Sequence, residues 1–182
     1  MQQYSQTVVW IFSSLTILGQ IAVVLLALIL IVRKFQPKDK TSKKIVSLIA
    51  NNYIVLIFLI TAAASAGSLF LSDIMGYLPC KLCWYQRIFI YPQVIISGVA
   101  LFTSDVNVRK YLLPLSLIGA LIAIYHILLQ AFPSVLQCGD EAVSCSTNQF
   151  VGFGYVTIPI MSLTAFTFLI FVNVSTYLKE KK

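Results

Sequence analysis

The sequence predicts an all-α integral membrane protein, built as a four-helix transmembrane bundle with one extra transmembrane helix at its N-terminus. Of the 182 residues, 59% are hydrophobic and only 10% are charged, whereas about 25% of the residues of a soluble domain are charged. So few charged side chains could not cover the surface of a water-soluble globular protein. In addition, five apolar stretches reach the length of about 20 residues that a membrane-spanning helix needs.

The five stretches cover residues 7–32, 45–71, 84–102, 111–132 and 156–178. The first is not a signal peptide, because no Lys or Arg precedes it, its apolar run is too long, and no small-residue cleavage site follows it. A polar linker, residues 33–44, separates it from the rest. We therefore divide the chain into residues 1–44, the extra helix with a basic cytoplasmic linker, and residues 45–182, the four-helix bundle.

The Lys and Arg residues predict the orientation, because cytoplasmic loops of membrane proteins are enriched in them. Eleven of the thirteen lie on one side: Arg33, Lys34, Lys38, Lys40, Lys43, Lys44, Arg109, Lys110, Lys179, Lys181 and Lys182. This bias puts the N-terminus outside the cell and the C-terminus in the cytoplasm. The net charge of +7 does not indicate a nucleic-acid partner, because the basic residues are grouped between apolar runs without interleaved aromatic residues. The lipid bilayer is the predicted environment.

All four cysteines fall on the predicted outer face, in two loops. Cys80 and Cys83 form a Cys-x-x-Cys pair just before the third span, and Cys138 and Cys145 lie between the fourth and fifth spans. An even number of cysteines in an oxidising compartment indicates disulfide-forming pairs. Pairing within each loop is the simplest arrangement, although four cysteines allow three connectivities.

The first pair has the features of a reactive dithiol. Pro79 favours the start of a helix, and the free N–H groups and dipole of a helix N-terminus stabilise a thiolate. Arg87 follows Cys83 by four residues, so both lie on one helical face, and we expect Cys83 to be the stabilised thiolate.

The Cys80–Cys83 pair has two alternative interpretations. The first is a structural disulfide, but such a bridge closes too short a loop to add much stability. The second is one half of a zinc site, but the other two cysteines lie two membrane crossings away. We therefore predict no metal.

The second pair and the single histidine are open to two interpretations each. A bridge between Cys138 and Cys145 is either a clamp on the loop or an exchange-competent disulfide that carries electrons between a soluble partner and the first pair. His126 lies near the outer end of the fourth span. Ionisable residues inside a membrane segment are functional candidates, so it either relays a proton or makes a hydrogen bond between helices.

These motifs resemble those of the DsbB/BdbC family of disulfide-forming membrane oxidoreductases. The resemblance rests on LPCKLCWYQR at residues 78–87, YHILLQ at residues 125–130, the Cys138/Cys145 pair, and GFGYVTIPIMSL that follows it. It covers residues 45–178, and the short second loop is closer to the BdbC branch. The departure is the N-terminal helix, because members of the family usually have four helices.

The resemblance implies a catalytic route through all four cysteines in a bacterial cytoplasmic membrane. A thioredoxin-like extracytoplasmic thiol oxidase, similar to DsbA or BdbD, reduces the Cys138–Cys145 disulfide, which exchanges with Cys80–Cys83. Cys83 then passes electrons to a membrane quinone, ubiquinone or menaquinone, bound beside Arg87 with help from His126. Two alternatives remain open: an enzyme similar to vitamin-K-epoxide reductase, and a non-enzymatic tetraspan scaffold with structural disulfides.

Overall fold

The described part of the chain is mainly helical, as the sequence predicts. The computed structural model describes residues 2–36, 39–132, 144–146 and 148–180. Its elements are α1 (Gln2–Phe35), α2 (Lys40–Asn51), α3 (Tyr53–Leu69), the π-helical turn η1 (Phe70–Ile74), α4 (Lys81–Thr103), the 3₁₀ turn η2 (Val106–Val108), α5 (Arg109–Ala131) and α6 (Ile158–Glu180). Among the described residues, the β structure is limited to one isolated bridge between Gly152 and Val156.

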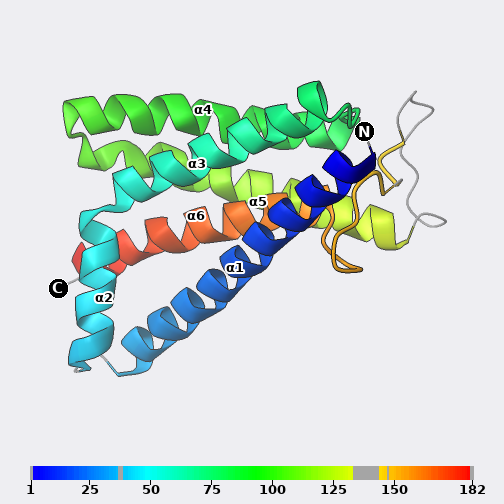
Figure 1. The fold of residues 1–182 in the computed structure, drawn as a ribbon. Helices are drawn as coiled ribbons and strands as arrows, with labels where there is room; N and C mark the ends of the chain where they lie inside the picture. Colours follow the sequence, from blue (N-terminus) through cyan, green and yellow to red (C-terminus); the bar gives the residue numbers. More distant parts are fainter. Residues whose placement is uncertain (1, 37–38, 133–143, 147, 181–182) are drawn as a thin grey trace.

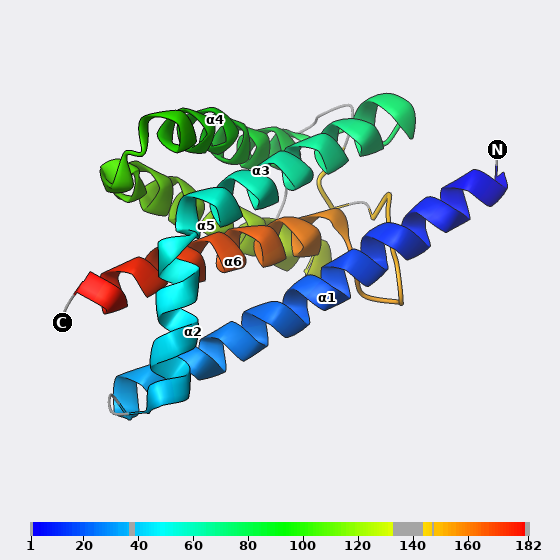
Figure 2. The same ribbon diagram turned by 60° about the vertical axis from the view of Figure 1, so that its left-hand side comes forward.

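Helices α3, α4, α5 and α6 run side by side and form the bundle (Figure 1). Along the chain, α3 packs on α4, α4 on α5 and α5 on α6, and α6 closes the bundle by contacting α3. The extra helix α1 crosses α6 obliquely, and α2 lies across one end of the bundle, as the turned view in Figure 2 also shows. The predicted four-helix bundle with an extra N-terminal helix is therefore confirmed.

Within the described residues, four helices are long and apolar enough to cross a membrane: α1, α3 with its π turn, α5 with its 3₁₀ turn, and α6. The third predicted span, residues 84–102, corresponds to α4, which is less apolar than the other four because it contains polar residues such as Gln86, Arg87 and Gln93. Its 23 residues extend about 35 Å at the rise of an α-helix, which is enough to cross the bilayer beside α3 and α5. The chain is a multi-pass membrane protein.

The second span begins later than the sequence predicts. Residues 45–51 belong to the separate helix α2, and the span itself starts at Tyr53. The break occurs at Asn52, whose side-chain amide donates to the carbonyl of Leu48 at 2.9 Å and whose backbone leaves helical geometry. Asn competes in this way with the helical backbone, so the Asn51–Asn52 pair ends α2. The boundary between residues 44 and 45 consequently lies inside α2.

Helix α2 is amphipathic and has a polar face with three lysines. Val46 and Ala50 are buried on its other face, and Lys179 of α6 donates a hydrogen bond to Asn51 at its end. Asp39 caps its N-terminus by accepting from the backbone N–H of Ser42 at 2.6 Å, which lowers the pKa of the Asp39 carboxyl. Such a helix suits the plane of a membrane surface, with its lysines toward the head groups.

The bundle core combines close backbone approach with hydrogen bonds between helices. Gly119 of α5 faces the ring of Phe166 of α6, where an added Cβ would lie 2.3 Å from ring carbons. Between α4 and α5, Ser116 donates to the side-chain oxygen of Gln93 at 3.0 Å, and both residues are fully buried. These contacts fix the rotation of α4, α5 and α6, and hence the direction in which the residues near the cysteines point.

Candidate functional site

The Cys-x-x-Cys pair lies where the chain turns into α4. After the π turn, Gly76 adopts a left-handed φ of 74°, which glycine tolerates best, and the chain then runs without helix to Cys80. Cys80 is the N-cap of α4, with extended φ and ψ of −73° and 172°, and Cys83 lies in the first helical turn. The helix thus begins two residues after Pro79 rather than at it, but both cysteines occupy the N-terminus as expected.

The two cysteines are hydrogen-bonded thiols with different roles. The Cys80 Sγ donates to the Cys83 Sγ at 3.5 Å. The Cys83 sulfur also accepts from the backbone N–H of Cys80. The side chain of the third helical residue thus reaches back to the N–H of the N-cap, as the acidic residue of a capping box does. The spacing of the motif therefore lets the sulfur of Cys83 accept two hydrogen bonds, one from the Cys80 thiol and one from the Cys80 backbone N–H.

This asymmetry moves the two pKa values in opposite directions. Both residues precede the predicted span that starts at Trp84. The hydrogen bond from Cys80 is the largest cause that lowers the pKa of Cys83 below 9.0, and the Arg87 charge adds a smaller contribution. The same hydrogen bond, together with burial, raises the pKa of Cys80 to about 11. Cys83 is therefore the thiol that ionises first, mainly because of its neighbour in the motif.

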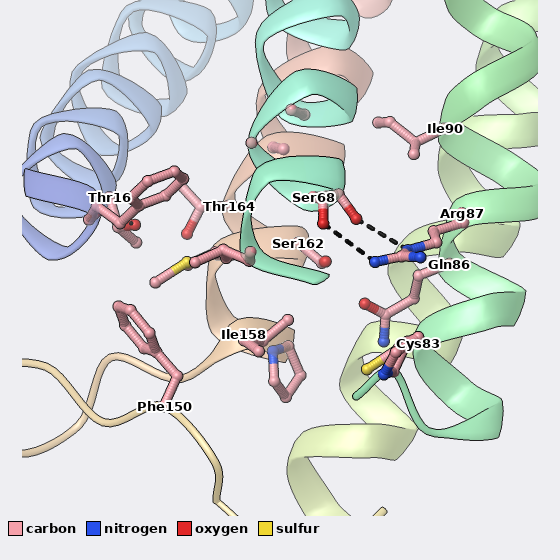
Figure 3. A pocket seen from close by; sticks show the side chains of 18 of the residues that line it. Thr16, Ser68, Cys83, Gln86, Arg87, Ile90, Phe150, Ile158, Ser162 and Thr164 are labelled. Atoms are coloured by element: carbon pink, nitrogen blue, oxygen red, sulfur yellow. Dashed lines mark hydrogen bonds between the residues drawn. The ribbon is translucent and has the colours of Figure 1, made fainter. Parts of the chain in front are cut away.

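Arg87 lies one turn below Cys83, but its guanidinium is directed across to α3 (Figure 3). It donates from Nε to the hydroxyl of Ser68 and from a terminal nitrogen to the Ser68 carbonyl, both at 3.0 Å. It also lies over the ring of Trp84, 5.1 Å from the centroid, and is only 9% exposed. Ser68 therefore fixes Arg87, a role that no local sequence signal indicated.

His126 of α5 is buried against the first cysteine pair. Its Nε2 lies 3.7 Å from the Cys80 Sγ and 3.1 Å from the carbonyl oxygen of Cys145. The side-chain amide nitrogen of Gln86 lies 3.2 Å from Nδ1. An amide N–H only donates and a carbonyl only accepts, so this pattern assigns the imidazole proton to Nε2. Gln86 of α4 therefore orients this ring.

The second pair is represented by Cys145 alone, because Cys138 lies outside the described residues. Cys145 is 1% exposed and belongs to one buried cluster with Cys80, Leu82 and Leu129. Its side chain is also a hydrogen-bond partner of Cys80. The structure thus brings together Cys80, Cys83, Cys145, Arg87 and His126. The predicted Cys138–Cys145 pairing stays a prediction.

Three potential metal ligands meet at this site. The ligand atoms of Cys80, Cys83 and His126 all lie within 4.8 Å of one another. The zinc alternative considered from the sequence combined the two cysteine pairs instead. In the arrangement observed, the Nε2 atom that faces the sulfurs carries the proton and is engaged by the Cys145 carbonyl. A metal would have to displace that hydrogen bond, so the geometry favours thiol chemistry here.

A cavity of about 440 Å³ opens beside the dithiol, within the range of small-molecule sites. One end of it is polar and is lined by Cys83, Gln86, Arg87 and His126. The remainder is mostly apolar and extends between α3 and α6 toward α1, as Figure 3 shows from close by. Cys80 and Cys83 both border the cavity, so a ligand at the polar end would contact the pair directly.

Comparisons with known proteins agree with this geometry. A sequence model of the family "Disulfide bond formation protein DsbB" matches residues 50–176. Disulfide bond formation protein C of Bacillus subtilis (strain 168) is 43% identical over 124 residues, which make up 65% of this chain and 90% of that protein. Probable disulfide formation protein C 2 of Bacillus anthracis is 36% identical over 137 residues, 75% of this chain and 98% of that protein.

A third relative is the SPbeta prophage-derived disulfide bond formation protein B of Bacillus subtilis (strain 168), 36% identical over 132 residues, 72% of this chain and 89% of that protein. No solved structure matches the chain. The family match begins at residue 50 and therefore excludes α1 and most of α2.

Proposed function

Because the chain belongs to the DsbB family of disulfide bond formation proteins, we propose that it is a membrane thiol:quinone oxidoreductase that reoxidises an extracytoplasmic thioredoxin-like protein. Family membership implies an oxidoreductase with a thiol–disulfide partner. The observation that carries the finer proposal is the position of Cys83: the thiol that ionises first borders a cavity with a polar end and an apolar body.

The electron route joins the two cysteine pairs by thiol–disulfide exchange. The reduced partner attacks the Cys138–Cys145 disulfide at Cys138 and leaves as a disulfide, so that Cys138 and Cys145 become thiols. The Cys145 thiolate attacks the Cys80–Cys83 disulfide at Cys80, and Cys83 leaves as a thiolate. Cys138 then displaces Cys80 and restores the Cys138–Cys145 disulfide. Each step exchanges one S–S bond for another, and the contact between Cys145 and Cys80 supports this order.

The residues around the dithiol favour Cys83 as the leaving group. A thiol of low pKa leaves faster in exchange, and the Cys80 thiol lowers the pKa of Cys83. His126 holds the segment of Cys145 against Cys80 through its Nε2–H, and Gln86 keeps the ring in that orientation. Arg87 supplies a fixed positive charge at the polar end of the cavity, where Ser68 positions it.

The cavity matches a quinone in size and in the positions of its polar and apolar parts. Its polar end supplies donors from Arg87 and Gln86 for carbonyl oxygens, and its apolar body suits a ring with a hydrocarbon tail. When bound, a quinone accepts the two electrons and two protons released as Cys80 and Cys83 form their disulfide. Both ubiquinone and menaquinone meet this description.

The proposed location is the bacterial cytoplasmic membrane, with the cysteines on the outer face. The basic residues supporting this orientation lie in the described part of the chain at the bundle end opposite the cysteines: Arg33, Lys34, Lys40, Lys43, Lys44, Arg109, Lys110 and Lys179 (Figure 1). The positive-inside rule assigns that end to the cytoplasm. The bundle of residues 45–182 would carry the redox centre, and residues 1–44 would add α1 and the basic linker.

The experiment that tests the function uses purified protein, a reduced thioredoxin-like dithiol protein and a quinone. The unaltered protein should oxidise the dithiol only when quinone is present. Cys83→Ser should abolish quinone reduction, and Arg87→Ala should raise the apparent KM for quinone by about tenfold or more, because a charge-assisted hydrogen bond contributes roughly 1.5–3 kcal/mol. Lys110→Ala, at the opposite end of the bundle, is the control for loss of a positive charge and should leave the KM unchanged.

Two results would contradict the proposal. If the unaltered protein oxidises no dithiol with any quinone, the oxidase function is wrong. If Arg87→Ala leaves the apparent quinone affinity unchanged, the role of Arg87 is wrong even though the oxidase function stands.

A further inference from the structure

Helix α1 forms one wall of the cavity beside the dithiol, although it lies outside the family match. Phe12, Leu15, Thr16 and Gly19 of α1 border the cavity that Cys83 and Arg87 border at its other end. A helix that served only to anchor the chain would need no such contact. The position of α1 therefore suggests that this helix contacts the ligand of the cavity.

The N-terminal half of α1 is docked on the bundle by specific contacts. Phe12 stacks on Phe70 of the π turn, with ring centroids 6.0 Å apart, and also lies against Gly67, where an added Cβ would come within 3.0 Å of its ring. Trp10 meets the ring of Phe153 edge-on at 4.7 Å. These contacts join α1 to α3 and to the segment before α6, so the wall is part of the folded protein.

A second set of contacts holds α1 to the segment that follows the cysteine loop. The hydroxyl of Tyr155 donates to the side-chain oxygen of Gln20 at 2.7 Å. Gly152 packs so closely on Ser13 that no Cβ would fit between them. Contacts at Ser13 and Gln20 therefore hold α1 near both ends of the stretch that faces the cavity, which runs from Phe12 to Gly19.

The surface that α1 presents to the cavity is apolar despite its hydroxyl groups. The Thr16 hydroxyl donates to the carbonyl of Phe12 at 2.7 Å, and the Thr164 hydroxyl of α6 donates to the carbonyl of Ile160 at 2.8 Å. Both hydroxyls are thus satisfied within their own helices. Between this wall and Arg87, the lining includes the small residues Ala64 and Gly67, which leave room for a chain to pass.

We propose that α1 is the binding wall for the hydrocarbon tail of the membrane quinone, and that Thr16 and Gly19 set which tails fit. The tail would run from the polar end at Cys83 between α3 and α6 to α1. This inference rests on the proposed thiol:quinone function and adds to it a role for the helix that the family match excludes. Side chains that line an apolar passage discriminate between hydrocarbon tails by length and bulk, because each additional buried methylene adds to the affinity.

Photolabelling of the unaltered protein tests the path of the tail directly. The probe is a quinone that carries a diazirine on its hydrocarbon tail. The chain has no Lys or Arg before Arg33, so trypsin releases the α1 wall as one peptide, residues 1–33, separate from residues 45–81, which contain α3. The label should appear on residues 1–33 and should be displaced by excess unlabelled long-tailed quinone. Displaceable labelling confined to other peptides would overturn the inference, as would labelling of residues 1–33 that the competitor does not displace.

A matched pair of variants tests selectivity for the tail. Thr16→Phe fills the cavity at the wall, whereas Ser14→Phe adds a similar bulk two residues away on the exposed face of the helix. Thr16→Phe should raise the KM for a long-tailed quinone by about tenfold or more, the cost of roughly two lost methylene contacts, with little change for a tailless quinone. Ser14→Phe should change neither KM.

The outcomes separate this inference from the function on which it rests. If Thr16→Phe affects the long-tailed and tailless quinones equally, or if Ser14→Phe has the same effect, α1 is not the tail wall. If the unaltered protein reduces neither quinone, the oxidase function itself is wrong. Activity of Thr16→Phe with the tailless quinone shows that the variant is folded.

Discussion

At the scale of single residues, the Cys-x-x-Cys motif separates its two thiols by their positions in the helix. Cys80 is the N-cap and Cys83 is in the first turn, so the backbone N–H and the thiol of Cys80 both point toward the sulfur of Cys83. Helix N-termini favour negative charge in general, but here the direct hydrogen bonds outweigh the more distant charge of Arg87. Arg87 therefore has little effect on this pKa, and Ser68 holds it at the polar end of the cavity.

Alkylation of the reduced protein tests this asymmetry. Only a thiolate reacts, so a lowered pKa moves the rise in reactivity to lower pH and a raised pKa moves it to higher pH. Cys83 should become reactive at a pH below 9.0, and Cys80 only as the pH approaches about 11. Trypsin cleaves at Lys81 between the two cysteines, so mass spectrometry of iodoacetamide-treated protein reports each one separately.

The pH at half-maximal reactivity, rather than the absolute rate, is the quantity to compare, because Cys80 is also the more buried residue. Equal midpoints, or a lower midpoint for Cys80, would contradict the assignment of Cys83 as the thiol that ionises first. In Cys80→Ser, the serine hydroxyl is a stronger donor than the thiol that it replaces, so the midpoint of Cys83 should not rise. Cys80→Ala removes the side-chain donor and should raise the midpoint of Cys83.

At the scale of elements, the packing of α5 on α6 determines where His126 and the cysteines meet. The contact depends on Gly119, because the ring of Phe166 occupies the space of its missing side chain. A larger residue would push α6 away from α5, and with it the segment that leads from Cys145 into α6. The sequence pattern predicts both helices but does not show that this glycine is the point of closest approach.

Gly119→Ala should lower the thermal unfolding midpoint of the purified protein in detergent, because overpacking a tight core costs about 1–3 kcal/mol. The control is Gly98→Ala in α4, whose added Cβ would meet the ring of Phe58 at an ordinary contact of 3.4 Å. Alanine favours helix over glycine, so the control should be unchanged or slightly stabilised. If the unfolding midpoint of Gly119→Ala equals or exceeds that of Gly98→Ala, the packing of Gly119 on Phe166 can adjust to the added methyl group without loss of stability, and the prediction is wrong.

At the scale of the whole molecule, the two ends of the bundle differ in chemistry. One end carries the described basic residues of α1, α2, α5 and α6, and the other carries the dithiol, His126 and the polar end of the cavity. Helix α2 lies across the basic end, where its lysines suit a membrane surface (Figure 2). This separation supports the predicted orientation, with the redox site facing the oxidising compartment.

Single cysteines placed at the two ends test the orientation in intact bacterial cells. In a chain whose own four cysteines are replaced by serine, Asn148→Cys lies in the exposed segment between Cys145 and α6, and Asn107→Cys lies in the exposed turn between α4 and α5. A membrane-impermeant maleimide should label Asn148→Cys in intact cells and Asn107→Cys only after the cells are permeabilised. The reverse pattern would place the cysteine end in the cytoplasm and would contradict the proposed exchange with an extracytoplasmic partner.

The sequence by itself determined the features that depend on local composition. The apolar stretches predict the membrane class and the helices, and the Cys80–Cys83 motif and its surroundings predict the family. Hydropathy predicts too early a start for the second span, because it averages over the break at Asn52, which depends on a side-chain hydrogen bond. Likewise, the spacing of Arg87 from Cys83 predicts a shared helical face, but not the pairing of Arg87 with Ser68 on another helix.

Only the tertiary structure decided which distant residues meet. His126 and Gln86 are 40 positions apart, and whether they face one another depends on how α4 and α5 are rotated by contacts such as Gln93 with Ser116. The same holds for α1, whose apolar sequence fits an isolated anchor equally well until its packing against Gly67 and Phe70 is known. Helix formation is a property of nearby residues, whereas the site and its cavity arise from packing between helices that are far apart in the chain.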